Sequence, residues 1–281
     1  MTSAAVRAFR ERGLAPKKSF GQNFLVDPNV ARRIAELSTT GSRAGDRPSG
    51  GTVVEIGAGL GALTEPLLAR AARVVAIERD RDLCPILREA LADAIQQGRL
   101  DVVEADAKRA DLAELLASGP KPRVLAGNLP YQLTGPLLER TTALADDLDW
   151  AVFMVQAEIS DRLLAAPGSE AYGALTVFVS GAFDVTRAMN VGRGAFHPRP
   201  GVDSAVVVLE PLRPPRARET DRFREAVRAA FAQRRKTLRN AWSALGPAAE
   251  VAARAESAGI DLGRRGETLS VEEFARFAGA R

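Results

Sequence analysis

The sequence has very few of the residues that hold metal ions or form disulfides. Among its 281 residues, Cys84 is the single cysteine and His197 the single histidine. One cysteine excludes an internal disulfide and a cysteine-based metal cluster, and one histidine excludes a histidine-ligated metal or a serine–histidine–aspartate triad elsewhere in the chain. No apolar run approaches the roughly 20 residues of a membrane span, and the first residues contain no apolar signal core. We therefore expect a cytoplasmic protein without a metal.

Basic residues are concentrated at the two ends of the sequence. Residues 211–281 carry 15 Lys/Arg against 9 Asp/Glu, whereas residues 1–210 have a net charge of −2. Residues 1–20 hold five basic residues and one acid. Basic ends favour a polyanion as partner, but a solvated surface explains the charge equally well.

Strand and helix patterns alternate through the middle of the sequence. The predicted strands are 52–57, 73–78, 100–104, 123–127 and 150–155, with helices near 61–70, 80–96, 111–117 and 135–144. This alternation is typical of an α/β fold with a doubly wound parallel sheet. Two further strands, near 182–189 and 203–210, have no evident helix between them, and we expect them to form an antiparallel edge.

A proline-rich segment follows the last predicted strand. Residues 211–215 contain three prolines, which cannot continue a helix or a strand. We therefore predict a domain at 1–210, whose first residues 1–26 form a basic arm, and a small all-helical domain at 211–281. Its longest predicted helix, 221–243, places five apolar residues on one side: Phe223, Val227, Phe231, Leu238 and Trp242.

Three successive predicted strands end in residues that suit a nucleoside. The first runs into Gly57, Gly59 and Gly61, and glycines let a backbone turn tightly beside a ligand. Their spacing is G-x-G-x-G rather than the dinucleotide fingerprint G-x-G-x-x-G, so a ligand without a pyrophosphate is favoured. Glu78 ends the next strand, where a carboxylate can accept both ribose hydroxyls. Asp106 follows the third strand and can accept from an exocyclic amine.

The fourth strand end carries an amide and an aromatic ring. Residues 124–131 read Val-Leu-Ala-Gly-Asn-Leu-Pro-Tyr, and ligands of open α/β sheets bind where the strands end. The Asn128 oxygen can accept from an N–H of a base, and Tyr131 offers a face for stacking. The alternative is structural: Asn128 and Pro130 form a turn, and Tyr131 packs against the following helix.

Taken together, these motifs resemble a known family of enzymes. The sequence is similar to S-adenosylmethionine-dependent adenine N6-methyltransferases, and it most closely resembles the small-subunit ribosomal RNA adenine dimethyltransferases (KsgA type). The resemblance extends from about Lys17 to Ser243. Five motifs carry it in order: Lys17–Leu25, Glu55–Gly61, Asn128–Tyr131, Ala195–Pro200 with Val202–Ala205, and Gln233–Asn240.

The resemblance implies a Rossmann-like methyltransferase sheet, the cofactor S-adenosylmethionine and a set of site residues. The implied cofactor residues are Gln22, Asn23 and Leu25, which close over the cofactor, and Gly57, Gly59, Glu78, Asp106, Ala107 and Asn128. The implied catalytic residues are Asn128, Leu129, Pro130, Tyr131 and Phe196. One position departs from the family: Ala157 stands where a lysine is usual, which puts a cationic contact to RNA in question.

The residues themselves support a mechanism of the same kind. Acceptors at N6–H of an adenine, such as the side chain of Asn128, draw the nitrogen toward a tetrahedral shape, so that its lone pair points at the methyl group. Tyr131 and Phe196 would sandwich the extruded base, and stacking is worth about 1–3 kcal/mol per base. No general base is needed. The alternative for Phe196 is a place in the core.

The predicted RNA contacts lie at the two basic ends of the sequence. Helical spacing places Arg228, Arg235 and Arg239 on one side of the predicted helix, although a solvated helix face is the alternative. The full predicted set is Lys17, Lys18, Arg228, Arg234, Arg235, Lys236 and Arg239.

The resemblance implies dimethylation of two adjacent adenines in a loop near the 3′ end of small-subunit ribosomal RNA. The expected partner is this RNA or the immature small subunit, and we expect a monomer. Two alternatives remain open: a large-subunit RNA methyltransferase of the erythromycin-resistance type, and an assembly factor that acts mainly by binding. A nicotinamide dehydrogenase is disfavoured by the glycine spacing.

Overall fold

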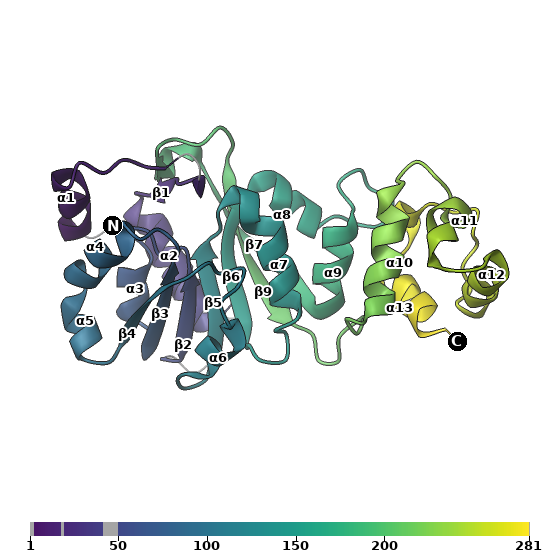
Figure 1. Cartoon of the computed structure of the whole chain (residues 1–281), viewed down its shortest axis with the longest axis horizontal. Coiled ribbons are helices and arrows are strands. Elements are labelled where there is room, and N and C mark those ends of the chain that lie inside the picture. The colour runs from purple at the N-terminus through teal and green to yellow at the C-terminus, as the bar shows by residue number, and fades with distance from the viewer. Residues whose placement is uncertain (1–2, 18–19, 42–49, 281) are drawn as a thin grey trace. The chain divides into compact units, whose positions relative to one another are not determined.

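The chain divides into two compact units. The computed structural model describes residues 3–17, 20–41 and 50–280 (Figure 1). The first unit comprises Met1–Ser160 and Thr186–Glu210, and the second comprises Asp161–Val185 and Pro211–Arg281. One division between the two units falls after Glu210. Segment 161–185, which the sequence analysis placed in the first domain, belongs to the second unit.

A seven-stranded sheet forms the framework of the first unit. Its strands lie in the order β4 (Leu100–Glu104), β3 (Arg73–Glu78), β2 (Thr52–Ile56), β5 (Arg123–Asn128), β6 (Trp150–Gln156), β9 (Ser204–Pro211) and β7 (Phe183–Val191). The first five run parallel to one another, and β9 runs antiparallel to β6. The predicted doubly wound α/β fold is therefore confirmed, and the two further predicted strands lie together at one edge of the sheet, where β9 is antiparallel to β6.

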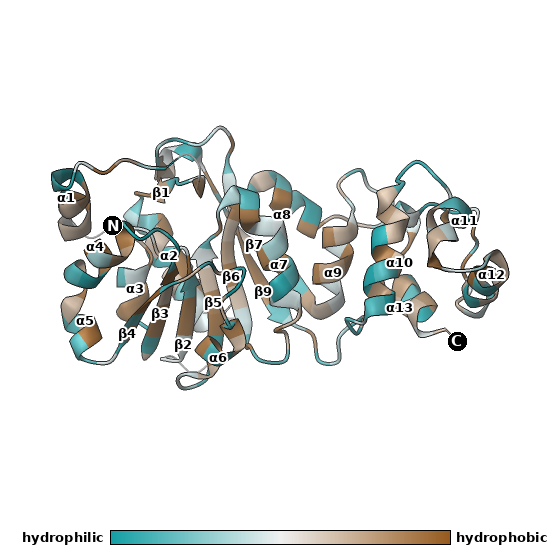
Figure 2. Ribbon diagram, viewed as in Figure 1, coloured by the Kyte–Doolittle hydropathy of each residue, from teal (hydrophilic) through white to brown (hydrophobic). Residues whose placement is uncertain are grey.

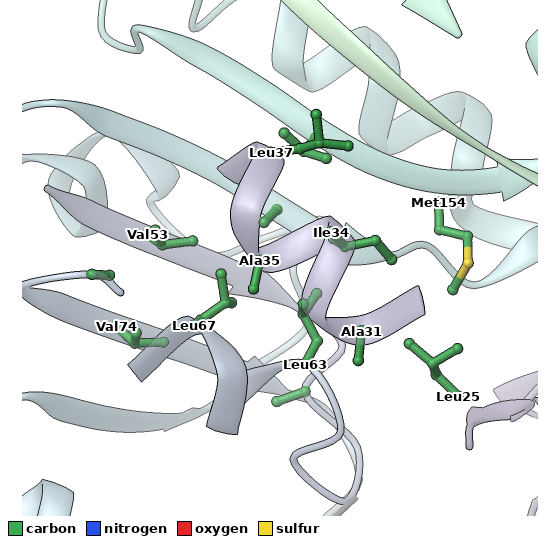
Figure 3. Packing of buried hydrophobic residues seen from close by; sticks show 14 of the residues in the cluster. Leu25, Ala31, Ile34, Ala35, Leu37, Val53, Leu63, Leu67, Val74 and Met154 are labelled. Carbon is green, nitrogen blue, oxygen red and sulfur yellow. The ribbon is translucent and has the colours of Figure 1, made fainter. Parts of the chain in front are cut away.

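Helices lie before, between and after the parallel strands along the chain. They are α2 (Pro28–Thr40), α3 (Thr64–Leu68), α4 (Leu83–Ala90), α5 (Ala92–Gln96), α6 (Leu112–Ala117), α7 (Thr134–Thr142) and α8 (Ala157–Leu163), which ends in the second unit. In the core, Ala35 of α2 lies on the side of Leu67 of α3 and Val53 of β2, whereas Ile34 of α2 points toward Met154 of β6 (Figure 3). Hydrophobic residues accordingly line the strands (Figure 2).

The N-terminal residues form a helix and a strand instead of the plain basic arm that the sequence analysis predicted. Helix α1 (Ser3–Glu11) packs on α4 and buries Ala5 and Phe9 in a small apolar cluster with Leu83. Further along, β1 (Phe24–Leu25) pairs antiparallel with β8 (Phe196–His197). Neither element was predicted, because a nine-residue helix and a two-residue strand leave little periodicity in a sequence.

Helices surround one apolar core in the second unit. They are α9 (Ala174–Ala182), α10 (Asp221–Ala232), α11 (Leu238–Ala241), α12 (Ala248–Ser257) and α13 (Val271–Gly279). Trp242 stacks on Phe277 at 3.8 Å between ring centroids, and its indole N–H donates to the Ala226 carbonyl at 2.9 Å. The predicted small helical domain is present, and it also includes α9 from segment 161–185.

The predicted single helix at 221–243 is wrong. Helix α10 ends at Ala232, and the chain then turns before α11 begins at Leu238. At this turn Thr237 forms a β-bridge with Arg265, and the Leu238 amide donates to the Arg264 carbonyl at 2.8 Å. A continuous helix would have to use its own carbonyls for these amides, so the tertiary contact interrupts it.

Candidate active site

A pocket opens at the carboxyl ends of the four strands β4, β3, β2 and β5. Asp106, Glu78, Gly57 and Asn128 follow or end these strands in that order, and all four line the pocket. The space between the lining atoms is about 1180 Å³, including the open mouth. Ligands of open α/β sheets bind where the strands end, so this pocket is the candidate ligand site.

The glycine turn after β2 forms the floor of this pocket. Gly57 and Gly59 have φ angles of 77° and 57°, which other residues rarely adopt. A Cβ on Gly59 would lie 3.3 Å from the Phe24 ring, which covers the turn from the N-terminal arm. A side chain at Gly59 would therefore occupy part of the space between the glycine turn and the Phe24 ring.

Glu78 lies at the end of β3 and is 8% exposed. One of its carboxylate oxygens accepts from the Gly59 amide and the other from the Asp80 amide, both at 2.8 Å. Burial raises the pKa of Glu78, although these backbone hydrogen bonds oppose the shift. A carboxylate has about four acceptor positions, so Glu78 keeps acceptor capacity for a diol while its orientation is fixed.

Glu55 is a pocket residue to which the sequence analysis gave no role of its own. It lies in the buried strand β2, is 1% exposed, and accepts from the Thr64 hydroxyl at 2.6 Å. Burial raises its pKa to about 7, and the nearby charge of Glu78 adds to the rise. A glutamate inside an otherwise apolar strand was the signal in the sequence, since carboxylates are rarely fully buried without a partner.

Asp106 is held in a turn after β4. One of its carboxylate oxygens accepts from the Lys108 amide at 3.0 Å. From α7, the Arg140 guanidinium donates to the carbonyls of Ala107 and Ala110, at 3.1 and 2.7 Å. Arg140 thus ties the turn that presents Asp106 and Ala107 to the helix that follows the Asn128–Tyr131 motif.

Asn128 ends β5 with its side chain in the pocket. Its amide nitrogen donates to the backbone carbonyl of Asn23 at 3.2 Å. This hydrogen bond fixes the orientation of the amide group. No described residue donates to the Asn128 Oδ1 atom, which can therefore accept from a ligand. Asn128 therefore has a defined acceptor toward a ligand as well as a contact with the N-terminal arm.

Tyr131 also lines the pocket, three residues further along. Its hydroxyl lies 3.1 Å from the Ser204 hydroxyl, which holds the ring at the end of β9. Between them, Leu129 is 1% exposed and its amide donates to the Met154 carbonyl at 3.1 Å. Asn128, Leu129 and Tyr131 all line the pocket, and the backbone of Leu129 holds the motif to β6.

The N-terminal arm closes one side of the pocket with residues 20–25. Leu25 pairs with Phe196 across β1 and β8, and Asn23 contacts Asn128 as described. The Gln22 side chain donates from Nε2 to Asp80 at 2.8 Å and accepts from the Lys17 amide at 2.7 Å. Both polar atoms of the Gln22 side chain therefore form hydrogen bonds that hold the arm.

A family model described as ribosomal RNA adenine dimethylase matches residues 13–279. The chain belongs to this family. Among its curated relatives, the ribosomal RNA small subunit methyltransferase A of Geobacter metallireducens is 44% identical, and the match covers 96% of this chain and 97% of the relative. The protein of the same name from Moorella thermoacetica is 45% identical over 95% and 92% of the two chains.

Solved structures place the fold in the same family. A dimethyladenosine transferase from Plasmodium falciparum has a TM-score of 0.72 at 25% identity and covers 92% of this chain and 98% of its own. The 23S rRNA methyltransferase ErmE has a TM-score of 0.63 at 27% identity with the same coverage. The family-level expectation, an S-adenosylmethionine-dependent RNA adenine methyltransferase with a Rossmann-like sheet, is confirmed.

The pocket gathers the residues that this family's motifs indicated. Twelve of them line it: Gln22, Asn23, Leu25, Gly57, Gly59, Glu78, Asp106, Ala107, Asn128, Leu129, Pro130 and Tyr131. The residues present fit S-adenosylmethionine, since the glycine turn, two carboxylates and an amide suit an adenosine that carries no phosphate. In residues 3–17, 20–41 and 50–280, no group of three metal-ligating side chains was found.

Phe196 is not among the pocket residues, contrary to the predicted sandwich with Tyr131. Its side chain is 4% exposed and belongs to the main apolar cluster, covered by the pairing of β8 with β1. Phe196 therefore lies in the apolar core, which was the alternative to stacking on a base. Among the described residues, Tyr131 lines the pocket together with Phe20 and Phe24 of the arm.

The predicted RNA-binding residues differ in their surroundings. Lys17 donates to Asp80 and Asp82 at 2.5 and 2.6 Å, and Lys18 lies outside the described residues. Arg234 pairs with Glu267 at 2.9 Å. The remaining four, Arg228, Arg235, Lys236 and Arg239, are exposed in the second unit.

Because α10 ends at Ala232, the predicted common helix face for Arg228, Arg235 and Arg239 does not exist. Arg228 lies on α10, Arg235 in the turn after it, and Arg239 on α11.

Among the described helices, none combines the length and the apolar character that crossing a membrane requires.

Proposed function

We propose that the chain transfers methyl groups from S-adenosylmethionine to N6 of two adjacent adenines in a loop near the 3′ end of small-subunit ribosomal RNA. The observation that carries this proposal is the position of Asn128, which faces the same pocket as the glycine turn with its Oδ1 free. The relatives at 44–45% identity, which are named as small-subunit methyltransferases, support the choice of substrate.

The pocket residues would hold the cofactor through its adenosine. Glu78 would accept the ribose hydroxyls, Asp106 the exocyclic amine of the adenine, and the Gly57–Gly59 turn would lie against the nucleoside. S-adenosylmethionine, when bound, supplies an electrophilic methyl group on a positively charged sulfur. The arm residues Asn23 and Leu25 close this site against water, and well-oriented reactants gain roughly 7–11 kcal/mol from such positioning.

Asn128 would orient the attacking nitrogen of the target adenine. Its Oδ1 accepts one N6–H, which draws the nitrogen out of conjugation with the ring and turns its lone pair toward the methyl group. Tyr131 stacks on the base, which must leave its own stack to enter the pocket. The methylated nitrogen loses its proton to solvent, so no side chain has to act as a base.

The exposed cations of the second unit would contact RNA phosphates. Arg228, Arg235, Lys236 and Arg239 have no common helix face, so each would contact the backbone separately. Replacing Arg239 with alanine should flatten the dependence of log affinity on log salt by about one unit of slope per lost phosphate contact. Binding titrations over a series of salt concentrations measure this change, and an unaltered slope would exclude Arg239 from the RNA interface.

The deciding experiment compares the two ribosomal subunits as substrates. Under-methylated small subunits and, separately, large subunits are incubated with the protein and S-adenosylmethionine labelled in the methyl group. We expect label in the small subunit alone, recovered as N6,N6-dimethyladenosine after digestion to nucleosides. Label in the large subunit would favour the activity named for ErmE, which shares the fold at 27% identity. Subunit binding without any label would favour an assembly factor.

A further inference from the structure

The N-terminal arm is held over the pocket by a buried carboxylate that belongs to no motif considered above. Asp80 lies two residues after Glu78, on the loop between β3 and α4, and its side chain is 2% exposed. One of its oxygens accepts from the Lys17 ammonium at 2.5 Å, and the other from the Gln22 amide at 2.8 Å. Gln22 in turn accepts from the Lys17 backbone amide at 2.7 Å. The three residues form a closed ring of hydrogen bonds.

The same loop also holds Glu78, the residue assigned to the ribose. The Asp80 backbone amide donates to Glu78 at 2.8 Å, and the other Glu78 oxygen accepts from Gly59 in the floor of the pocket. Between these residues, the Arg79 guanidinium lies 4.8 Å from the centre of the Phe20 ring, which lines the pocket from the arm. Three consecutive residues therefore connect the cofactor side of the loop with the arm.

We propose that Asp80 is a positioning residue. Its hydrogen bonds to Lys17 and Gln22, here called the latch, hold the N-terminal arm over bound S-adenosylmethionine. Its backbone amide links the position of the arm to that of Glu78. The inference rests on the proposed use of this pocket for the cofactor. The role of Gln22 follows from it: its side chain closes the latch, and its contribution to cofactor binding is indirect.

The environment of Asp80 makes this latch stronger than an ordinary surface ion pair. Burial alone would raise the pKa of Asp80, but the hydrogen bonds from Lys17 and Gln22 outweigh it and hold the pKa below its usual value. The hydrogen bonds that Lys17 donates to Asp80 and Asp82 raise the pKa of Lys17. Hydrogen bonds to charged groups contribute more than neutral ones, and losing one partner leaves the others unsatisfied.

The rest of the arm has separate anchors, so loss of the latch should free a limited segment. Before it, Phe9 packs in the apolar cluster of α1 and α4. After it, Asn23 bonds to Asn128, and Leu25 belongs to the β1–β8 pair. Among the described arm residues, Lys17 and Gln22 are therefore the ones that Asp80 holds directly.

The test uses the isolated full chain and the cofactor without RNA. Asp80→Asn keeps the shape of the side chain and removes its charge. Asp82→Asn is the matched control, because Asp82 also pairs with Lys17 but its side chain is 49% exposed. We expect the Kd for S-adenosylmethionine, measured by calorimetry, to rise about tenfold or more in Asp80→Asn and less than about twofold in Asp82→Asn.

Limited trypsin digestion supplies a second readout, which would stay as in the wild type if Asp80 only stabilised the fold. In the wild type, we expect the cofactor to slow cleavage after Lys17, and in Asp80→Asn this protection should be lost while thermal unfolding stays close to wild type. Lys17→Met should raise the Kd as Asp80→Asn does, and the double variant should add little further, because both changes open one latch.

Equal cofactor affinity in Asp80→Asn and Asp82→Asn would overturn the latch, as would full additivity in the double variant. If Asp80→Asn fails to fold, Lys17→Met decides in the same way from the arm. Either negative result would overturn the latch without contradicting the proposed methylation of RNA by the wild type. A wild-type chain that binds no S-adenosylmethionine would instead defeat the proposed function itself.

Discussion

Replacing Glu55 with glutamine should remove one source of pH-dependent stability from the first unit. Glu55 is buried in β2, and burial raises its pKa from 4.5 to about 7. In the unfolded chain the same carboxyl loses its proton near 4.5. Between these two values the folded protein holds a proton that the unfolded chain has released, so the free energy of unfolding falls as the pH rises through this window.

The expected magnitude follows from the two pKa values. Each pKa unit corresponds to about 1.4 kcal/mol, so the ionised Glu55 destabilises the folded state by about 3 kcal/mol above pH 7. Glutamine resembles the protonated carboxyl, because it keeps an acceptor for the Thr64 hydroxyl and carries no charge. The variant and the wild type should therefore be equally stable near pH 4.5 and differ by about 3 kcal/mol near pH 8, with Glu55→Gln the more stable.

Urea unfolding at a series of pH values measures this difference. Each unit contains one tryptophan, Trp150 in the first and Trp242 in the second. A Trp242→Phe background therefore leaves Trp150 to report on the first unit alone. Glu65→Gln, an exposed acid on α3, is the matched control and should show a constant difference from wild type. A constant difference for Glu55→Gln, or a loss of stability at pH 8, would refute the reasoning.

Two further changes test how the strand ends are held. Gly127→Ala would push a Cβ into the Ile56 carbonyl of the neighbouring strand. We therefore expect the free energy of unfolding to fall by about 1–3 kcal/mol. An unchanged urea midpoint would contradict the close approach of β5 to β2. Arg140→Ala removes both hydrogen bonds to the turn that presents Asp106, so calorimetry should show several-fold weaker binding of S-adenosylmethionine, whereas Arg109→Ala, an exposed change on the same turn, should bind as wild type does.

The sheet could be predicted from the sequence because its signals are local. Most of its strands are buried apolar runs that end next to a polar or glycine residue, and all seven strands lie within two residues of their predicted bounds. Gly57, Glu78, Asp106 and Asn128 could be grouped without coordinates, since successive parallel strands bring their carboxyl ends to one edge.

The arm and the interrupted helix depend on contacts between distant residues, which periodicity does not encode. Lys17 reads as a free cation in the sequence, and only its approach to Asp80 shows that it is paired. Phe196 lies next to prolines and reads as an exposed loop residue, whereas pairing with Leu25 buries it. Leu238 continues the helical spacing of α10, but its amide bonds to another segment.

The central claim is that Asn128 aims the attacking nitrogen at the methyl group. The direct measurement is the single-turnover rate of methyl transfer to under-methylated small subunits, by wild type and by Asn128→Ala, at saturating S-adenosylmethionine. Saturation offsets any weakening of cofactor binding from the lost contact with Asn23. We predict a rate about 10²–10³-fold lower in the variant, in line with the loss of one well-placed hydrogen bond to the reacting group. A variant that transfers methyl groups at the wild-type rate would contradict the account.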